Sequence, residues 1–301
     1  GSPLAAAASP ERGSAEADPR ALTVATWNVA CFQKATPAQI AVTLAKFGAD
    51  VIATQEDIEF NSTSQDQALC IPGYTKVSAC RAEALWDSER AYAWGGRYLQ
   101  NAIYARDSTI ELVRRFAKNI SKPEVVGDYL RCAAAADVVP KPTSVTSWTA
   151  DRSPIRVVTV HLTGGKYVDA HRDAYDGEKA HEVMTAAALF PDIIVGDFNS
   201  YPTAAQVAEY QQAYDPYIEA KKSGTLNLYM GWALEGTSQA ERAGFFRLQN
   251  YQNTTHFGGT VDQAYVRSSG YRFYPHFEVA NSSAGKFTES DHAAVLFGVS
   301  L

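Results

Sequence analysis

The stretch Asp192-Ile-Ile-Val-Gly-Asp-Phe-Asn-Ser-Tyr-Pro202 bears more directly on the fold than any other part of the 301-residue sequence. Its apolar, β-branched start at Asp192–Val195 predicts a short strand that is buried on both faces. Asp197 and Asn199 follow at once, where the strand gives way to a turn. On its own, a Gly-Asp-x-Asn sequence is most often a turn or the N-cap of a helix. Its meaning therefore depends on what the rest of the chain places beside it.

Other predicted strands also end or begin at a polar or ionisable residue. These strands are Leu22–Trp27, Asp50–Gln55, Ile155–Val160, Val261–Val266 and Ala293–Val299, and the polar residues beside or within their ends are Asn28, Glu56, His161, Asp262, Asp291 and His292. Ligand sites gather at strand ends because loops converge there over a rigid support. Each residue alone has an ordinary structural explanation, but together they predict one functional site.

Glu56 and Asp291 indicate the chemistry of that site. Both carboxylates are flanked by apolar strands, where an unpaired charge would be costly. A hard cation would relieve this cost, and oxygen ligands from Glu, Asp and Asn suit Mg²⁺ or Mn²⁺ much better than zinc. The sequence therefore predicts a Mg²⁺ site, with Mn²⁺ as the alternative ion.

Composition limits the class of protein. With 46% hydrophobic and 20% charged residues, the chain has the composition of a soluble globular protein. No run of about 18 apolar residues occurs, so stable membrane insertion is excluded. The sequence shows neither a heptad repeat nor an exposed apolar stripe; it leaves the oligomeric state open, and a monomer is the expectation. The net charge of −6 disfavours nonspecific binding of nucleic acid through many phosphates. A nuclease remains compatible with it, because a metal ion supplies positive charge locally.

The pattern along the chain predicts a flexible tail over residues 1–20 and one domain over residues 21–301. An amphipathic helix is expected at Pro37–Phe47, with Pro in its first turn and Gly48 after its end. Further strands are expected near Tyr98–Ala105, Ile110–Phe116, Tyr129–Val138 and Tyr271–Val279, and further helices near Asp169–Leu189 and Thr203–Tyr210, followed by an irregular aromatic-rich stretch to about Thr254. This order favours two sheets packed face to face with helices outside.

The four cysteines form neither a CxxC pair nor a zinc-binding spacing; they are Cys31, Cys70, Cys80 and Cys132. Two interpretations are open: a Cys70–Cys80 disulfide in an oxidising compartment, or four reduced, partly buried thiols. Four N-x-S/T sequons favour a secretory route; they begin at Asn61, Asn119, Asn253 and Asn281.

Six short motifs, in order, carry a resemblance to a known family. They are Trp27-Asn28, Gln55-Glu56, His161-Leu162, Gly196-Asp-Phe-Asn199, Val261-Asp262 and Ser290-Asp-His292. This set resembles the successive motifs of the endonuclease/exonuclease/phosphatase superfamily and spans Leu22 to Leu301. The resemblance implies a deoxyribonuclease-like α/β fold, a four-layer α/β/β/α sandwich with two packed mixed β-sheets. It also implies metal-dependent hydrolysis of a phosphoester.

The same resemblance implies roles for the metal-binding and base residues. Glu56 is expected to be the principal Mg²⁺ ligand, helped by Asn28 and Asp291. Asp262 is expected to hold His292 in one tautomer, so that His292 takes a proton from the attacking water.

Further residues are expected to act on the substrate. Asp197 and Asn199 would orient the water or the phosphoryl oxygens, and His161 would bind the phosphate or protonate the leaving oxygen. Arg131 stands where several family members place a phosphate-binding arginine, and Asn28 is a second candidate for substrate binding.

Some family signatures are absent. The inositol-phosphatase sequence Cys-Asp-Arg is replaced by Thr260-Val-Asp-Gln263, and the carboxylate that pairs with the equivalent of His161 in pancreatic-type deoxyribonucleases is missing near Gly96. The stretch Gly196–Pro202 is closest in style to deadenylase-like and generic nuclease members. We therefore expect an endonuclease or exonuclease acting on DNA or RNA. The alternatives are a phosphoesterase for a lipid or small molecule, such as a sphingomyelinase, and a non-catalytic member of the fold.

Two other clusters have competing interpretations. The first cluster could be a second metal site, but we interpret it as a solvated, charged helix face. It comprises His171, Asp173, Asp176, Glu178 and His181. The second could stack unpaired bases but is interpreted as core; it comprises Tyr210, Tyr214, Tyr217, Tyr229, Trp232, Phe245 and Phe246.

Overall fold

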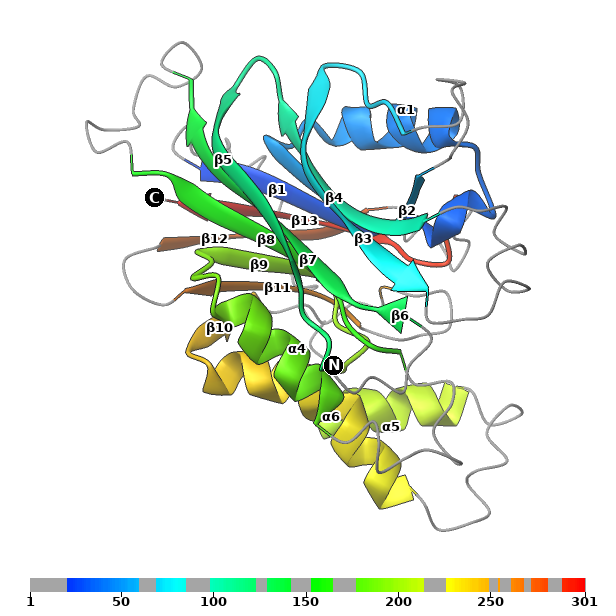
Figure 1. Cartoon of the computed structure of the whole chain (residues 1–301). Helices are drawn as coiled ribbons and strands as arrows, with labels where there is room; N and C mark the ends of the chain where they lie inside the picture. The colour runs from blue at the N-terminus through cyan, green and yellow to red at the C-terminus, as the bar shows by residue number, and fades with distance from the viewer. Residues whose placement is uncertain are drawn as a thin grey trace, which may run out of the picture.

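A computed structural model describes residues 21–59, 69–84, 98–122, 129–141, 153–164, 177–213, 226–248, 254, 261–267, 272–280 and 289–300. The tail predicted at residues 1–20 lies outside them. The described strands form two sheets that pack face to face, with helices on the outer side of each sheet (Figure 1). The predicted four-layer sandwich with two mixed sheets is confirmed.

The first sheet has seven strands in the order β12-β13-β1-β2-β4-β3-β6. Their bounds are Ala21–Asn28 (β1), Val51–Glu59 (β2), Tyr74–Ala84 (β3), Tyr98–Arg106 (β4), Tyr129–Leu130 (β6), Arg272–Ala280 (β12) and Ala294–Ser300 (β13). β1 and β2 are parallel and the other neighbours are antiparallel, so the sheet is mixed.

The second sheet has six strands in the order β10-β11-β9-β8-β7-β5. Their bounds are Ile110–Asn119 (β5), Cys132–Pro140 (β7), Ile155–His161 (β8), Ile193–Asp197 (β9), Phe245–Arg247 (β10) and Asp262–Arg267 (β11). Here β8 and β9 form the parallel pair. Each sheet thus contains one parallel pair among its described strands. The carboxyl ends of these two pairs carry residues of the candidate site.

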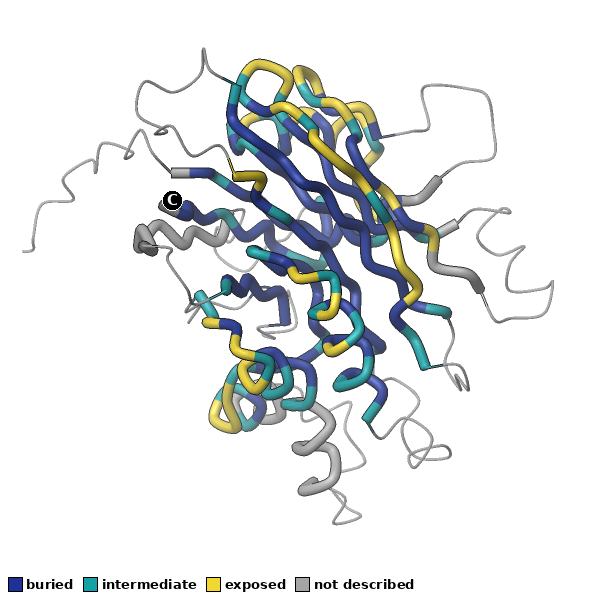
Figure 2. The backbone as a smooth tube through the Cα atoms, turned by 60° about the vertical axis from the view of Figure 1, so that its left-hand side comes forward, coloured by how far each residue is buried: buried dark blue, intermediate teal, exposed yellow. Residues whose placement is uncertain are grey.

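Helices cover the outer faces of both sheets. The helix α1 (Pro37–Phe47) lies on the first sheet, and α4 (Glu178–Ala187) and α6 (Leu226–Arg242) lie on the second, with α5 (Ala204–Ala213) beside α6 (Figure 1). A short 3₁₀ helix, η1 (Ala30–Phe32), follows β1. Three separate apolar clusters fill the spaces between the sheets, between the first sheet and α1, and between the second sheet and its helices. Figure 2 shows the inner strands as continuous buried segments.

The helix α1 begins and ends where its sequence predicts. The Thr36 hydroxyl accepts a hydrogen bond from the Gln39 amide, and the Gln39 side chain accepts one from the Thr36 amide, which completes a capping box. Gly48 ends the helix with φ 62, a left-handed conformation that glycine adopts without a steric penalty.

Three predictions of the secondary structure were wrong or incomplete. The stretch before Thr254 is not irregular throughout, because it contains α6 and β10. The strand β3 has no counterpart in the prediction, and the strand expected at Tyr129–Val138 is divided at Arg131 into β6 and β7. Of the helix expected at Asp169–Leu189, the described part is α4, whose N-cap is Gly177, and residues 169–176 lie outside the described residues.

Close packing explains why α6 does not look like a typical helix in the sequence. A Cβ atom at Gly236 would lie 2.7 Å from the Ser200 hydroxyl oxygen and 2.9 Å from a methyl group of Leu162. Glycine disfavours helices in general, but here it allows α6 to approach the loops that follow β8 and β9.

Both interpretations of the cysteines were wrong. Cys80 on β3 forms a disulfide with Cys132 at the start of β7, and their Cα atoms are 6.0 Å apart. Cys70 is exposed and free, and Cys31 is buried and free. The disulfide joins the two sheets across the sandwich. Its two cysteines are 52 positions apart in the sequence, so no local sequence pattern predicts the pairing.

Candidate active site

The parallel strand pairs bring the predicted residues to one edge of the sandwich. β1 and β2 place Asn28 beside the segment that carries Glu56. β8 and β9 pair His161 with Asp197, and β11 runs antiparallel to β9 so that Asp262 lies opposite Asp197. Because the two sheets pack face to face, the ends from both sheets meet.

Glu56 leaves the regular course of β2. The pairing of β2 with β4 shifts between Thr54 and Asp57, and Glu56 adopts φ 54. A non-glycine residue held in a sparsely populated region costs roughly 1–3 kcal/mol. The Glu56 side chain is 25% exposed, whereas Thr54 and Asp57 are fully buried. The irregularity therefore exposes one carboxylate at the end of a buried strand.

Asn28 connects a carboxylate of each sheet. Its amide nitrogen Nδ2 donates to Oε1 of Glu56 at 3.0 Å and to Oδ2 of Asp197 at 3.1 Å. Its Oδ1 accepts from the Ala30 amide at 3.0 Å. The buried Asn28 amide thus faces the carboxylates with its nitrogen and holds them next to each other.

Two histidines flank the Asp197 carboxylate. Nε2 of His161 lies 3.5 Å from Oδ2 of Asp197 and 3.8 Å from Oε1 of Glu56. Nε2 of His292 lies 3.8 Å from the same Asp197 oxygen, and its Nδ1 lies 2.8 Å from Oδ2 of Asp262. The Asp262 carboxylate therefore fixes one side of the His292 ring and leaves Nε2 facing the centre.

Burial and neighbouring charges set the protonation of these groups. Burial lowers the pKa of His292, but Asp262 and Asp197 outweigh that effect and raise it to about 10. Burial, with the positive charge of Arg131, holds the pKa of His161 well below its usual range. Burial raises the pKa of Asp197 to about 7, against the effect of His292. His292 therefore holds a proton more tightly than a free imidazole does, and His161 holds one less tightly.

The donor set fits a divalent cation. Asp197, Asp262 and His292 offer ligand atoms that all lie within 4.8 Å of one another. Oδ1 of Asp262 is buried, and among the described residues it has no hydrogen-bond partner. A buried carboxylate oxygen in this condition is costly unless a charge balances it. The carboxylates of Asp197 and Asp262 supply oxygen atoms of the kind that suits Mg²⁺.

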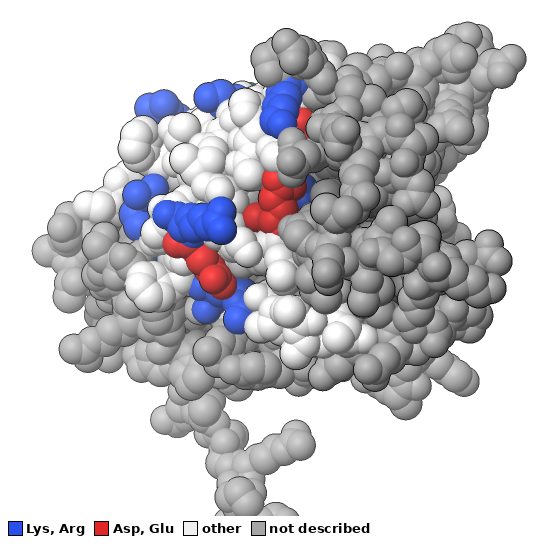
Figure 3. All heavy atoms as spheres, turned by 90° about the horizontal axis from the view of Figure 1, so that it is seen from below, with Lys and Arg blue, Asp and Glu red and all other residues white. Residues whose placement is uncertain are grey.

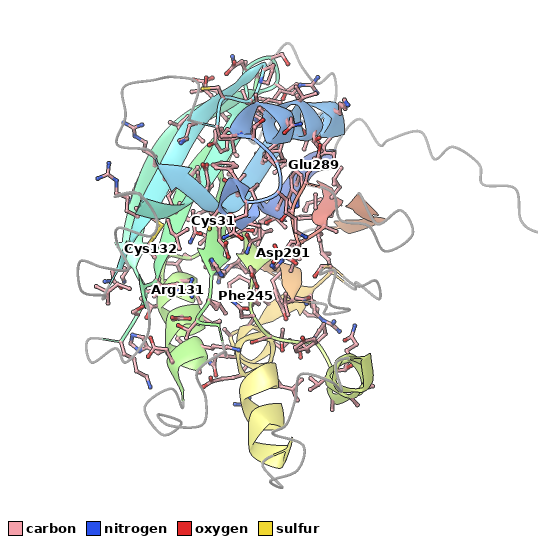
Figure 4. The ribbon with its side chains drawn as sticks, turned by 90° about the vertical axis from the view of Figure 1, so that its right-hand side faces the viewer. Cys31, Arg131, Cys132, Phe245, Glu289 and Asp291 are labelled. Carbon is pink, nitrogen blue, oxygen red and sulfur yellow. A yellow bond between two sulfur atoms is a disulfide. The ribbon has the colours of Figure 1, made fainter. Side chains whose placement is uncertain are left out.

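Asp291 and Cys31 lie on the Glu56 side of the site. The Cys31 thiol donates to Oε2 of Glu56 at 3.0 Å. Burial, followed by the charges of Glu56 and Asp291, raises the pKa of this thiol. Figure 4 shows Cys31 and Asp291 near the centre of the molecule. The carboxylates of Glu56 and Asp291 therefore both lie close enough to affect the same thiol group. Cys31 is absent from the predicted site, although it follows Asn28 by only three residues.

Arg131 borders the site from the break between β6 and β7. It is buried and lines a small pocket with Glu56, His161, Gln100 and Asn101. Figure 4 shows it beside Cys132, the disulfide partner of Cys80. A guanidinium group next to a histidine suits the oxygens of a phosphate.

The side chain of Asn199 is hydrogen-bonded to the turn that follows β8. Its amide donates to Oδ1 of Asp197 at 2.8 Å, and its side-chain Nδ2 donates to the Leu162 carbonyl at 2.8 Å. These bonds join the turn after β9 to the turn after β8. Asn199 thus lies beside the site with its side chain already hydrogen-bonded.

Two residues of the predicted motifs, neither of which has a predicted role in the site, attach His292 to the first strand. The Ser290 hydroxyl donates to the Asn28 carbonyl at 2.6 Å and accepts from the His292 amide at 3.1 Å. Trp27 Nε1 donates to the His292 carbonyl at 2.8 Å. Both residues adjoin predicted ones in the sequence, which is the signal that could have identified them.

The two additional clusters are only partly described. Glu178 is 3% exposed and accepts a hydrogen bond from the Lys122 amide, so its assignment to a solvated helix face was wrong. His181 is half-buried, and His171, Asp173 and Asp176 lie outside the described residues. In the aromatic cluster Phe245 is buried and Phe246 is 55% exposed, and the side chains of its other members lie outside the described part.

The fold and the site together define a phosphoester hydrolase of the deoxyribonuclease-like type. The profile of the Endonuclease/Exonuclease/phosphatase family matches residues 25–292, which contain all six strand-end motifs. The chain belongs to this family, whose members are generally metal-dependent phosphoesterases, and it is a phosphoesterase by family.

Solved structures share the fold at low sequence identity. An endonuclease/exonuclease/phosphatase protein from Beutenbergia cavernae superposes with a TM-score of 0.64 at 12% identity, covering 94% of this chain and 72% of that one. A mannosyl-6-phosphatase from Bacteroides thetaiotaomicron gives 0.55 at 14%, covering 93% and 100%. D. rerio TDP2 in complex with a single-stranded DNA product gives 0.52 at 15%, covering 93% and 99%. No curated protein sequence matches the chain.

The described surface carries charges of both signs. In the view from below, Lys and Arg side chains are interspersed with Asp and Glu side chains (Figure 3). Among the described helices, none is long and apolar enough to cross a membrane.

Proposed function

We propose that the protein is a Mg²⁺-dependent phosphodiesterase that hydrolyses nucleic acid by in-line attack of water. The observation that carries the proposal is the 2.8 Å contact between Nδ1 of His292 and Oδ2 of Asp262, beside the carboxylates of Asp197 and Glu56. A histidine held by a buried carboxylate at one nitrogen has its other nitrogen available as a general base.

Carboxylates at the edge of the site would hold the metal. Glu56 and Asp291 would hold a Mg²⁺ ion beside Asp197 and Asp262, with Asn28 ordering Glu56 against Asp197. A bound divalent cation supplies positive charge to the phosphoryl oxygens and lowers the pKa of the nearby imidazole of His292.

Side chains of the protein carry out the proton transfers and bind the phosphate. Nε2 of His292 removes a proton from water as the water oxygen bonds to phosphorus, and the opposite P–O bond breaks. Asp197 or His161 delivers a proton to the leaving oxygen. Arg131 and the neutral His161 bind the non-bridging oxygens, and Asn199 orders the turn that carries Asp197.

Three observations favour nucleic acid as the substrate. The inositol-phosphatase signature is replaced at Thr260–Gln263. The stretch Gly196–Pro202 resembles deadenylase-like members. A structural relative, D. rerio TDP2, has been solved with single-stranded DNA product.

A small-molecule or lipid phosphoester is the second candidate substrate. The net charge of −6 disfavours long-range attraction of a polyanion. Another structural relative is a mannosyl-6-phosphatase.

A panel of substrates separates these candidates. The wild type and the variants Glu56→Gln and His292→Ala are incubated with plasmid DNA, single-stranded RNA, sphingomyelin and a sugar phosphate, with Mg²⁺ or with EDTA. We expect cleavage of a nucleic acid only by the wild type with Mg²⁺. Cleavage of another phosphoester alone would assign the second candidate, and intact substrates throughout would indicate a non-catalytic member of the fold. The exposed Asp107→Asn variant serves as the control for a lost carboxylate.

A further inference from the structure

The helix α4 turns ionisable side chains towards the protein interior. Lys179 and Glu182 are fully buried, and Glu178 is 3% exposed. Buried charges are costly unless they are paired and hydrogen-bonded, and an apolar pair of similar size is often as stable or more stable. Packing alone therefore does not explain why α4 buries three ionisable side chains.

Lys179 contacts the turn that follows β9. Its Nζ donates to the carbonyl oxygen of Asn199. Asn199 has φ 44, a left-handed conformation that asparagine adopts more readily than most residues with a side chain. The same residue donates its amide to Asp197. Lys179 therefore fixes the carbonyl group of a left-handed turn residue two positions after Asp197.

Glu182 contacts the turn that follows β8. Its Oε2 accepts from the Thr163 amide at 2.8 Å, and its Oε1 accepts from the Thr163 hydroxyl at 2.6 Å. Thr163 is buried and lies two residues after His161. One carboxylate thus satisfies both donors of a loop residue beside the site.

A single helix face presents both side chains. Residues three positions apart on a helix are neighbours on its surface, so Lys179 and Glu182 point the same way from α4. Burial lowers the pKa of Lys179, and the charge of Glu182 is among those that oppose this effect. The bond from Asn199 Nδ2 to the Leu162 carbonyl closes the connection between the two turns.

We propose that Lys179 and Glu182 are positioning residues of the active site, holding the turns of Asn199 and Thr163 so that His161 and Asp197 keep their mutual geometry. The distance they maintain is the 3.5 Å between Nε2 of His161 and Oδ2 of Asp197. This inference rests on the proposed phosphodiesterase function. The solvated helix face predicted from the sequence includes Glu178 and His181 of this helix, and neither Lys179 nor Glu182 belongs to the predicted site.

Kinetics of matched variants test the proposal. Lys179→Met removes the donor while keeping the length of the side chain, and Lys179→Arg keeps the charge. Misplacement of catalytic groups by about 1 Å can cost on the order of 10²-fold in rate. We expect Lys179→Met and Glu182→Gln to lower kcat/KM on the cleaved phosphodiester by at least about 10-fold, and Lys179→Arg to recover part of that loss.

Two controls distinguish positioning from loss of stability. Ile40→Val lies in α1, on the other sheet, and lowers the Tm without touching either turn. Lys46→Met removes an exposed lysine of α1. Below its Tm each control is expected to keep wild-type kcat/KM. Values for Lys179→Met and Glu182→Gln equal to those of Ile40→Val would overturn the proposal while leaving the proposed function intact.

Hydrogen exchange gives a readout that does not depend on activity. The Thr163 amide donates to Glu182, and the Asn199 amide donates to Asp197. We expect faster exchange at the Thr163 amide in Glu182→Gln and at the Asn199 amide in Lys179→Met, but not in Ile40→Val. If the wild type cleaves no phosphoester, the proposed function fails. Unchanged exchange at both amides would then also overturn the positioning role.

Discussion

Nδ1 of His292 lies 2.8 Å from Oδ2 of Asp262, so a histidine from the loop before β13 is fixed by the first residue of β11. Asp262 is itself 1% exposed, and its backbone amide donates to the Thr254 hydroxyl at 3.2 Å. The pair therefore joins two strands that belong to different sheets. This relationship explains why His292 presents Nε2, rather than Nδ1, to the carboxylates of the site.

Replacing Asp262 by Asn is expected to lower kcat by at least about 10²-fold, as when a positioned base is lost. The neutral amide no longer holds Nδ1–H through a charge-assisted hydrogen bond, and where its Nδ2 faces the ring it donates to Nδ1 and favours the tautomer in which Nε2 is not basic. Steady-state kinetics on the cleaved phosphoester measure the effect, with Asp107→Asn as the exposed control. A rate equal to that of the wild type would remove the pair from the mechanism.

The same variant is expected to change the pH profile. Burial lowers the pKa of His292, and Asp262 is the largest of the influences that raise it. Without that charge His292 loses its proton at lower pH. The acid limb of the remaining kcat profile should therefore move to lower pH in Asp262→Asn. A limb that stays in place would show that another group titrates there.

Glu182 is expected to make the stability depend on pH. Burial, against the opposing effect of Arg131, raises its pKa to about 7, from 4.5 for an unperturbed group. Between these values the folded state holds a proton that the unfolded state releases. The contribution of Glu182 to the free energy of unfolding is therefore full below about pH 4.5 and falls as the pH rises to about 7, by at most roughly 3 kcal/mol.

Urea unfolding of the wild type and Glu182→Gln at pH 5 and pH 7.5 measures this contribution. The amide that the substitution introduces does not titrate, so the stability of the wild type relative to the variant should be higher at pH 5 than at pH 7.5. A difference between the two proteins that is the same at both pH values would contradict the raised pKa.

Loss of the Cys80–Cys132 disulfide is expected to lower the free energy of unfolding by about 2–4 kcal/mol, because the bond closes a long loop in the unfolded chain. Denaturant unfolding of Cys80→Ala/Cys132→Ala measures the loss. Cys70→Ser removes an exposed, free thiol and should leave the curve unchanged. Coincident curves for the double variant and the wild type would show that the bond contributes nothing.

Gly236→Ala is expected to destabilise the protein by about 1–3 kcal/mol, although Ala is the better helix former. The added Cβ would approach the Ser200 hydroxyl oxygen to 2.7 Å. Thermal unfolding compares the variant with Gly236→Ala/Ser200→Gly, where the nearest contact is relieved. A higher Tm for the single variant than for the wild type would contradict the close packing of α6.

The sequence predicts most of the fold because apolar periodicity is a local property. The strands that later prove to be buried, such as β8 and β9, are nearly continuous runs of Val and Ile. Helix α1 carries its own start and stop signals. The polar residues at strand ends could be identified for the same reason, since an Asp or Glu at the end of such a run is conspicuous.

Contacts between distant segments explain what the sequence does not predict. The partner of Cys80 lies 52 residues away, and a short spacing suggested Cys70 instead. Lys179 and Glu182 look like any charged pair on a helix surface, because segments distant in the sequence bury them, among them the turns after β8 and β9. Helix α6 contains Gly236, which fits there because Ser200 and Leu162 of other segments leave no room for a Cβ atom.

Cleavage of a short single-stranded oligonucleotide by the wild type, Glu56→Gln and His292→Ala, each with Mg²⁺ and again after EDTA treatment, tests metal-dependent hydrolysis at this site most directly. We expect cleavage by the wild type with Mg²⁺, none after EDTA, and a loss of at least about 10²-fold in kcat in both variants. Cleavage that persists in EDTA, or wild-type rates in both variants, would contradict metal-dependent hydrolysis at this site.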